Sequence, residues 1–127
     1  IRDSDYIVSG SYGHNTLTGN AGDDTFAYTS NSSALVDTIT DFGVGADRLD
    51  IHAITTQGST VDESLVAAMA ENAAFANGSD TAIYYDGTNS YVYVDSNHDN
   101  VYNAGSDVAI KLVNYHMTAI DPALVHA

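Results

Sequence analysis

Cysteine is absent from the 127 residues, which excludes disulfide bonds and any metal site built on thiolates. Basic residues are scarce as well, because three lysines and arginines stand against 17 acidic residues, for a net charge of −14. A surface this acidic repels phosphate groups, so the composition argues against nucleic acid or an anionic membrane surface as a partner. The same charge makes the folded chain repel itself, and bound cations would relieve that repulsion.

Long apolar runs and catalytic motifs are also missing. No stretch approaches the roughly 20 apolar residues of a membrane-spanning helix, so we expect no membrane insertion. The opening Ile1-Arg2-Asp3 does not resemble a secretory signal peptide. The sequence contains no nucleophile elbow, no H-E-x-x-H motif and no phosphate-binding loop, and nearly every acid stands in a turn-like frame. We therefore expect a non-catalytic protein, not an enzyme.

Two adjacent nine-residue frames are the main pattern of the chain. Residues 10–18 and 19–27 both follow G-x-x-G-x-[DN]-x-U-x, where U is a large apolar residue, Leu17 or Phe26. Half-copies stand at 5–7 and 37–39. This nonapeptide is typical of calcium-binding parallel β-helix repeats, in which x-U-x forms a short strand with its apolar residue inward. Because the first half-copy lacks its glycine frame, we expect further repeats upstream in a longer protein.

Calcium takes six to eight oxygen ligands, and a glycine-rich turn of carbonyls closed by one carboxylate supplies several of them. Successive turns fall on alternate edges of such a coil, which pairs Asp5 with Asp24 on one edge. Asn15 then pairs with Asp37 on the other, where the neutral amide predicts a weaker site. Ordinary β-turns are the alternative interpretation. The predicted ligands are Asp5, Gly10, Tyr12, Asn15, Gly19, Ala21, Asp24, Asp37 and Asp41.

The rest of the chain predicts further strands. We expect an all-β-dominated fold in a single domain, with a short parallel β-roll over 1–51 that runs into a β-sandwich-like C-terminal cap over 52–127. Apolar runs at 81–85 and 91–94 flank a glycine-containing loop and predict a hairpin. The final strands are expected at 108–113 and 118–120.

One α-helix is expected within the cap, at about 61–76. Thr60 is a suitable N-cap, and the acids at 62 and 63 would lie in the first turn, where the helix dipole favours negative charge. Leu65 and Met69 would lie on an apolar face, and Asn77-Gly78 is a typical stop signal. These signals predict a helix packed against the sheet.

A second acidic loop joins two of the predicted strands. Residues 95–100 place oxygen-bearing side chains at alternate positions, as the first half of an EF-hand loop does. Asn100 stands where that loop has glycine, and no closing glutamate follows, so Asp107 would close the ring instead. A solvated turn rich in Asx residues is the alternative. The candidate ligands here are Asp95, Asn97, Asp99, Val101 and Asp107.

The order of these motifs carries a family resemblance. After the nonapeptides come D-T-I-T-D-F at 37–42, a glycine-containing turn, and D-R-L-D-I at 47–51. This order is similar to the C-terminal region of calcium-binding type I secretion substrates, the RTX proteins, which include serralysin-type secreted proteins. Residues 91–95 and 105–112 resemble the closing strands of RTX-type bacterial surface-layer proteins. The resemblance covers nearly the whole chain.

The resemblance implies a module that ends a larger secreted protein, carries an uncleaved export signal near its C-terminus, and folds on calcium outside the cell. Its implied partners are calcium ions and the type I secretion machinery, and its implied location is extracellular, including the cell surface. The tail 118–127 is the candidate signal. Alternative functions are surface-layer assembly with a second copy of the chain, adhesion to surface polysaccharide through Tyr84, Tyr91 and Tyr93, and the non-catalytic tail of a secreted hydrolase.

Overall fold

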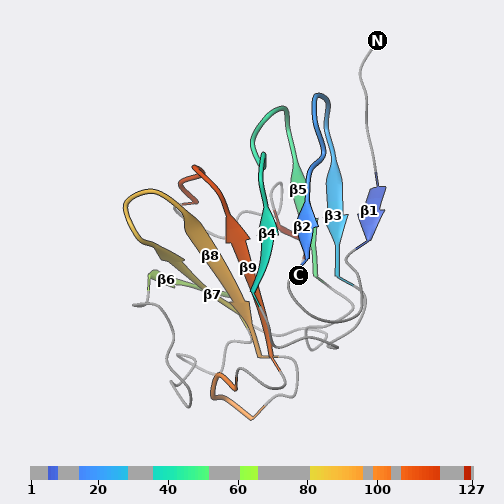
Figure 1. Ribbon diagram of the computed structural model, residues 1–127. Coiled ribbons are helices and arrows are strands. Elements are labelled where there is room, and N and C mark those ends of the chain that lie inside the picture. The colour runs from blue at the N-terminus through green and yellow to red at the C-terminus, as the bar shows by residue number, and fades with distance from the viewer. Residues whose placement is uncertain are drawn as a thin grey trace.

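The computed structural model describes residues 6–8, 15–28, 36–51, 61–65, 81–95, 99–103, 107–117 and 125–126. Over these ranges every regular element is a β-strand, and the strands form one four-stranded and one six-stranded sheet (Figure 1). The predicted all-β fold is confirmed. Within the described part of the chain, no helix is long and apolar enough to cross a membrane.

The four-stranded sheet is entirely parallel. Its order is β1 (Tyr6–Val8), β3 (Thr25–Ala27), β5 (Arg48–Asp50) and β10 (Val125–His126). The register places Ile7 beside Phe26, and Phe26 beside Leu49. These are the apolar central residues of every second x-U-x triplet along the chain, so one residue of each triplet points toward the core.

The six-stranded sheet contains the other two strands of the repeats, β2 and β4, and the strands of the cap, β6 to β9. Its order is β2 (Thr16–Leu17), β4 (Val36–Ile39), β9 (Val108–Leu112), β8 (Ser90–Val94), β7 (Thr81–Tyr85) and β6 (Val61–Leu65). Parallel pairing joins β2 to β4 and β4 to β9, whereas β9, β8 and β7 are antiparallel neighbours. The cap therefore continues a sheet of the repeats, and its hairpin lies where the sequence predicts it.

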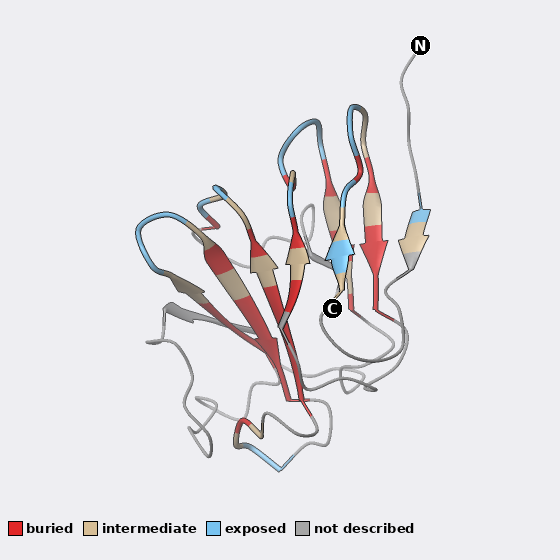
Figure 2. Ribbon diagram, in the orientation of Figure 1, coloured by how far each residue is buried: buried red, intermediate tan, exposed pale blue. Residues whose placement is uncertain are grey.

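Strands β1 to β5 alternate between the two sheets along the chain, as the nonapeptide frames predict. The two described connections between the sheets, β2 to β3 and β4 to β5, cross the same edge (Figure 1). The inward faces of both sheets share one core, which includes Phe26 and Leu49 from the first sheet and Ile39, Val92 and Ile110 from the second (Figure 2). The core fixes the phase of each strand, and thereby which residues reach the edges.

The predicted helix is wrong where the structure describes it. Residues 61–65 form β6, which pairs with β7 through Val61 with Thr81 and Leu65 with Ile83. Capping and first-turn charge are weak local preferences, and the pairing groups of a sheet edge override them here. The remainder of that prediction, 66–76, and the predicted strand at 118–120 lie outside the described residues.

Candidate metal centre

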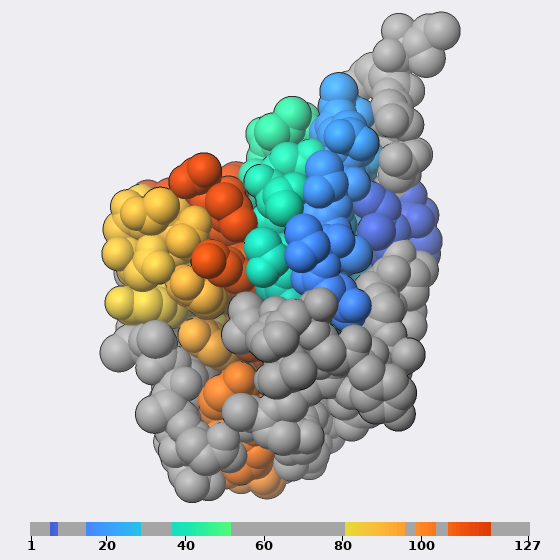
Figure 3. Space-filling model, in the orientation of Figure 1, coloured from blue at the N-terminus to red at the C-terminus, as the bar shows by residue number. Residues whose placement is uncertain are grey.

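Two loops stack on one edge of the repeats. Loop 18–24 joins β2 to β3, and loop 40–47 joins β4 to β5. Because β2 pairs with β4 and β3 with β5, the two loops run side by side, and they meet at the surface (Figure 3). We call residues 18–24 and 40–47 the loop stack.

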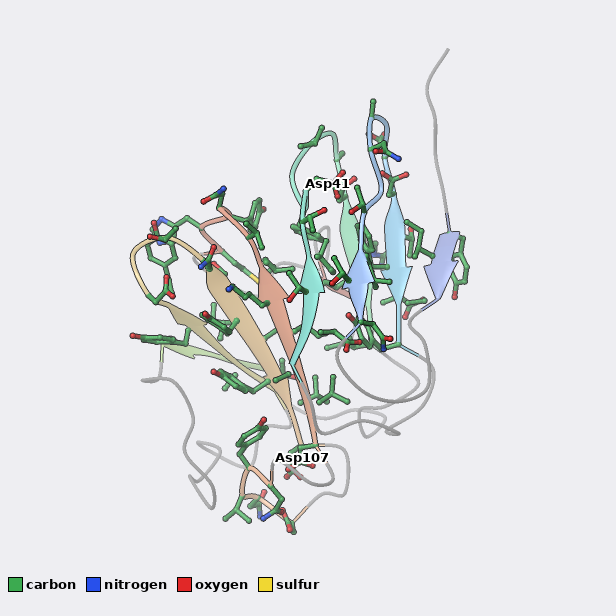
Figure 4. All side chains as sticks on the ribbon, viewed as in Figure 1. Asp41 and Asp107 are labelled. Atoms are coloured by element: carbon green, nitrogen blue, oxygen red, sulfur yellow. The ribbon has the colours of Figure 1, made fainter. Side chains whose placement is uncertain are left out.

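Acidic side chains of each loop accept hydrogen bonds from the backbone of the other. The Asp41 carboxylate accepts from Gly19 N at 3.0 Å and from Asn20 N at 2.6 Å (Figure 4). In the opposite direction, Asp23 Oδ1 accepts from Ala46 N at 3.0 Å. These contacts fix the spacing of the two backbones and hold four acids of the loop stack, Asp23, Asp24, Asp41 and Asp47, on one edge.

Asp47 is the central acid of the loop stack. Its side chain is 2% exposed, Oδ1 accepts from Asp24 N at 3.0 Å, and Oδ2 accepts from Gly43 N at 3.0 Å. Burial raises the pKa of the Asp47 carboxyl, the nearby Asp24 and Asp41 carboxylates add to that rise, and the two backbone donors oppose it. A cation at this edge would offset both the free-energy cost of burying the Asp47 carboxylate and its repulsion by Asp24 and Asp41.

Asp24 is 1% exposed, and its carboxylate occupies the space beside Gly19. A Cβ at Gly19 would overlap that carboxylate, and a Cβ at Gly45 would overlap the Gly22 carbonyl of the other loop. Gly45 also has φ of +106°, which disfavours other residues. The missing side chains leave room for carboxylate and carbonyl oxygens, which are the donors that calcium takes. The residues present therefore fit a calcium ion.

Asp47 and its glycines are the residues that sequence reasoning missed. Residues 42–50 form a third nonapeptide frame, with Gly43 and Gly45 at its second and fourth positions and Asp47 at its sixth. The first position is Phe42, which disguises the frame because the other two copies begin with glycine. Alignment on the acid and on the apolar Leu49 would have revealed it.

The other edge contains Asn15 and Asp37, which the register places side by side as predicted. Asn15 N donates to Asp37 Oδ1 at 2.9 Å, and Asn15 Nδ2 lies 3.4 Å from Asp37 Oδ2. Direct hydrogen bonds thus join this pair. Of the remaining predicted ligands, Gly19, Ala21, Asp24 and Asp41 belong to the loop stack, whereas Asp5, Gly10 and Tyr12 lie outside the described residues.

The second acidic loop brings three carboxylates together. Asp95, Asp99 and Asp107 place one oxygen each within 4.8 Å of one another. Asp95 directly follows β8, and Asp107 directly precedes β9 (Figure 4). Asp95 and Asp107 are fully buried, whereas Asp99 is exposed. Asp95 Oδ2 accepts from Asn100 N at 2.8 Å, and Asp107 Oδ2 accepts from Asn103 N at 2.7 Å.

Two further features of this loop bear on its predicted resemblance to an EF-hand. Asn100 has φ of +66°, so it adopts the conformation for which an EF-hand loop uses glycine. Val101 N donates to Asp99 Oδ1 at 3.1 Å, whereas Asn97 lies outside the described residues. We call Asp95, Asp99 and Asp107 the second acidic cluster.

The tyrosines of β7 and β8 pack on one another. Tyr91 stacks with Tyr84 at 6.2 Å between ring centroids and with Tyr93 at 6.3 Å, and Tyr93 meets Tyr102 edge-on at 5.3 Å. Tyr93 and Tyr102 are buried, whereas Tyr84 and Tyr91 are partly accessible. These ring contacts are typical of tyrosines packed on a sheet. Adhesion to polysaccharide through them stays a prediction.

The sequence matches the family described as Peptidase M10 serralysin C terminal over residues 3–123. No curated protein matches the chain. The matched region extends from the first half-copy of the repeat to residue 123 of the cap, and so includes the loop stack and the second acidic cluster. The chain therefore belongs to the serralysin C-terminal family, the calcium-binding C-terminal region of secreted proteins.

Proposed function

We propose that this chain is a non-catalytic calcium-binding module that folds on calcium outside the cell and carries the export signal of the protein it ends. The loop stack is the observation that carries the proposal. Two nearly inaccessible carboxylates, Asp24 and Asp47, lie there beside glycines whose missing side chains leave room for oxygen donors. Burying like charges is costly unless a cation pairs with them.

The calcium ligands in this proposal come from both loops. Asp24 and Asp47 would supply carboxylate oxygens, and Gly19, Ala21 and Gly22 would supply backbone carbonyls, as a carbonyl-lined turn does. Asp41 orients loop 18–24 through its two backbone hydrogen bonds. When bound, calcium supplies positive charge that holds the two loops together, and it performs no reaction.

The second acidic cluster is proposed as a separate calcium site. Asp95, Asp99 and Asp107 converge from the ends of two antiparallel strands, so the fold brings the ligands together without a flanking helix. Its three carboxylates favour a divalent cation with oxygen ligands. Asn97 and the Val101 carbonyl complete the proposed ligand set.

Calorimetric titration beside a hydrolase substrate screen tests the proposed class. We expect saturable calcium binding, much weaker magnesium binding and no hydrolysis, because magnesium requires a tighter octahedral geometry than carbonyl-rich turns offer. Titration of protein unfolded in denaturant is the control for nonspecific attraction to the −14 net charge. Equal binding of both metals, or turnover of a substrate, would contradict the proposal.

Export should be separable from calcium binding. A reporter fused ahead of Ile1 should leave the cell uncleaved through a type I exporter that accepts this class. Deletion of 118–127 should abolish that export and only partly weaken calcium binding. The tail contributes Asp121 and β10, whereas the loop stack ends at Asp47. Secretion is measured as reporter in the medium, and calcium binding by calorimetry on the purified deletion variant.

The control for the export experiment is a full-length fusion with Asp86→Ala, which removes one acid from an exposed hairpin and leaves the tail intact. Secretion of the deletion variant at the level of this control would place the signal elsewhere. Complete loss of calcium affinity in the deletion variant would make the tail part of the structural core.

A further inference from the structure

Loop 40–47 of the loop stack packs against an aromatic ring of the cap. The Tyr115 ring lies against Gly43, where an added Cβ would stand 2.8 Å from Tyr115 Cδ1. The same ring meets Phe42 edge-on, with 4.9 Å between centroids and 82° between planes. Tyr115 therefore packs against two consecutive residues of the loop that contains Asp47.

The segment that carries this ring is tied to the β7–β8 hairpin at four consecutive residues. Asn114 N donates to Asn89 Oδ1 at 2.9 Å, and Ser90 Oγ donates to Tyr115 O at 2.6 Å. Met117 N donates to the same hydroxyl at 2.8 Å. The fourth residue, His116, stacks on Tyr85 at 3.7 Å between ring centroids. The hairpin thus holds residues 114–117 in one position relative to the loop.

The backbone of Gly43, against which the Tyr115 ring packs, is hydrogen-bonded to Asp47 of the loop stack. Gly43 N donates to Asp47 Oδ2, and Asp47 Oδ1 accepts from Asp24 N, both at 3.0 Å. A shift of Gly43 would move the donor that orients the Asp47 carboxylate, and with it the contact between the two loops. Partners that orient a metal ligand commonly change affinity by about 10- to 100-fold when removed.

We propose that Tyr115, held by Ser90, is a positioning residue for the calcium site of the loop stack, so that the cap sets the affinity of the repeats. Tyr115 packs against Gly43, and Gly43 N donates to Asp47, so the ring acts on Asp47 through Gly43. This inference rests on the proposed calcium function of the loop stack. It adds Ser90 of β8 and Tyr115, which follows β9, to the residues that determine calcium affinity there.

Calcium titration of the whole chain, followed by amide resonances, tests the proposal site by site. The Gly43 amide reports on the loop stack and the Asn103 amide on the second acidic cluster, because each donates to an acid of its own site. Tyr115→Ala should weaken calcium binding read at Gly43 by about 10-fold and leave the affinity read at Asn103 unchanged. Tyr115→Phe, which keeps the ring, should bind as wild type does.

Two further variants separate positioning from general destabilisation. Ser90→Ala removes the hydroxyl that fixes residues 115 and 117, and should also weaken binding at Gly43 alone. Tyr91→Ala is the matched control, because it removes a ring of the same size from the neighbouring position on β8 without contact with loop 40–47. Should Tyr115→Ala fail to fold, Ser90→Ala decides the matter.

The outcomes separate this inference from the proposed function. Wild-type calcium affinity at Gly43 in Tyr115→Ala or in a folded Ser90→Ala would overturn the positioning role, as would an equal loss in Tyr91→Ala. Absence of calcium binding by the wild type would instead refute the proposed function. In that case, amide hydrogen exchange still tests the contact, because Tyr115→Ala should speed exchange at Gly43 and at Asp24 in the metal-free protein, and unchanged exchange would overturn it.

Discussion

Removal of calcium should lower the melting temperature of this chain by roughly 15 °C for each site lost. A ligand at about 1,000 times its dissociation constant stabilises the folded state by about 4 kcal/mol. About 1 kcal/mol shifts the melting temperature of a domain of this size by roughly 4 °C. Thermal melts followed by circular dichroism, with calcium and with a chelator, measure the difference.

The expected loss of thermal stability has an electrostatic cause, because the fold holds negative charges close together. The chain carries −14, and the loop stack packs four acids onto one edge. Because burial raises the pKa of Asp47 above its unfolded value, this group favours folding below the unfolded pKa, and that contribution is lost as the pH rises through the folded value. At neutral pH the metal-free loops therefore bury repelling carboxylates, which lowers the free energy of unfolding. Chelation should for this reason also expand the chain.

Screening alone must be separated from specific binding. Sodium chloride at an ionic strength matched to the calcium solution screens the net charge equally, and magnesium matches the ionic valence. Neither salt should restore the calcium melting temperature, because neither satisfies the ligand geometry of the turns. An identical melt in calcium and in chelator would contradict the prediction, as would full recovery in sodium chloride.

The repeats could be predicted from sequence because their information is local. Within nine residues, glycines set the turn, the acid sets the edge, and one apolar residue sets the phase of the strand. The alternation of β1 to β5 between two sheets follows from that period alone. The proximity of Asp95 and Asp107 could also be predicted from sequence, because antiparallel pairing places the end of one strand beside the start of the next. Val94, at the end of β8, pairs with Val108, at the start of β9.

The errors occur where distant residues decide the structure. Residues 61–65 satisfy helix-start rules, and only the pairing groups of β7, whose partners lie 18 and 20 positions later, make them a strand. The third frame begins with Phe42 in place of glycine, because that side chain is buried in the core and packs against Tyr115. Both facts depend on the cap, which the nonapeptide pattern does not encode.

The largest single-residue effect is expected at Asp24. Asp24→Ala should abolish calcium binding at the loop stack, with affinity lower by at least about 100-fold, which corresponds to about 2.7 kcal/mol. Removal of one partner from a buried charge pair usually costs about 3–5 kcal/mol, so this estimate is conservative. Calorimetry measures the loss as a lower number of calcium ions bound, while the second acidic cluster retains its own.

Asp86→Ala is the charge-matched control, because Asp86 is exposed on the hairpin and accepts hydrogen bonds only from its own turn and from Tyr91 in the described part of the chain. This control should keep the wild-type number of calcium ions, although it removes the same charge. Unchanged stoichiometry in Asp24→Ala would show that the loop stack binds no calcium, and an equal loss in both variants would reduce the effect to net charge.

Asn15→Asp tests the opposite edge in the opposite direction. The variant replaces a side-chain donor to Asp37 with a second carboxylate, so it should lower the melting temperature of the metal-free protein through repulsion. The added charge should at the same time tighten calcium binding at that edge, because ligand charge raises calcium affinity. Melts with and without calcium should therefore differ more for this variant than for wild type. A calcium response equal to that of wild type would mean that direct hydrogen bonds, and no metal, hold Asn15 to Asp37.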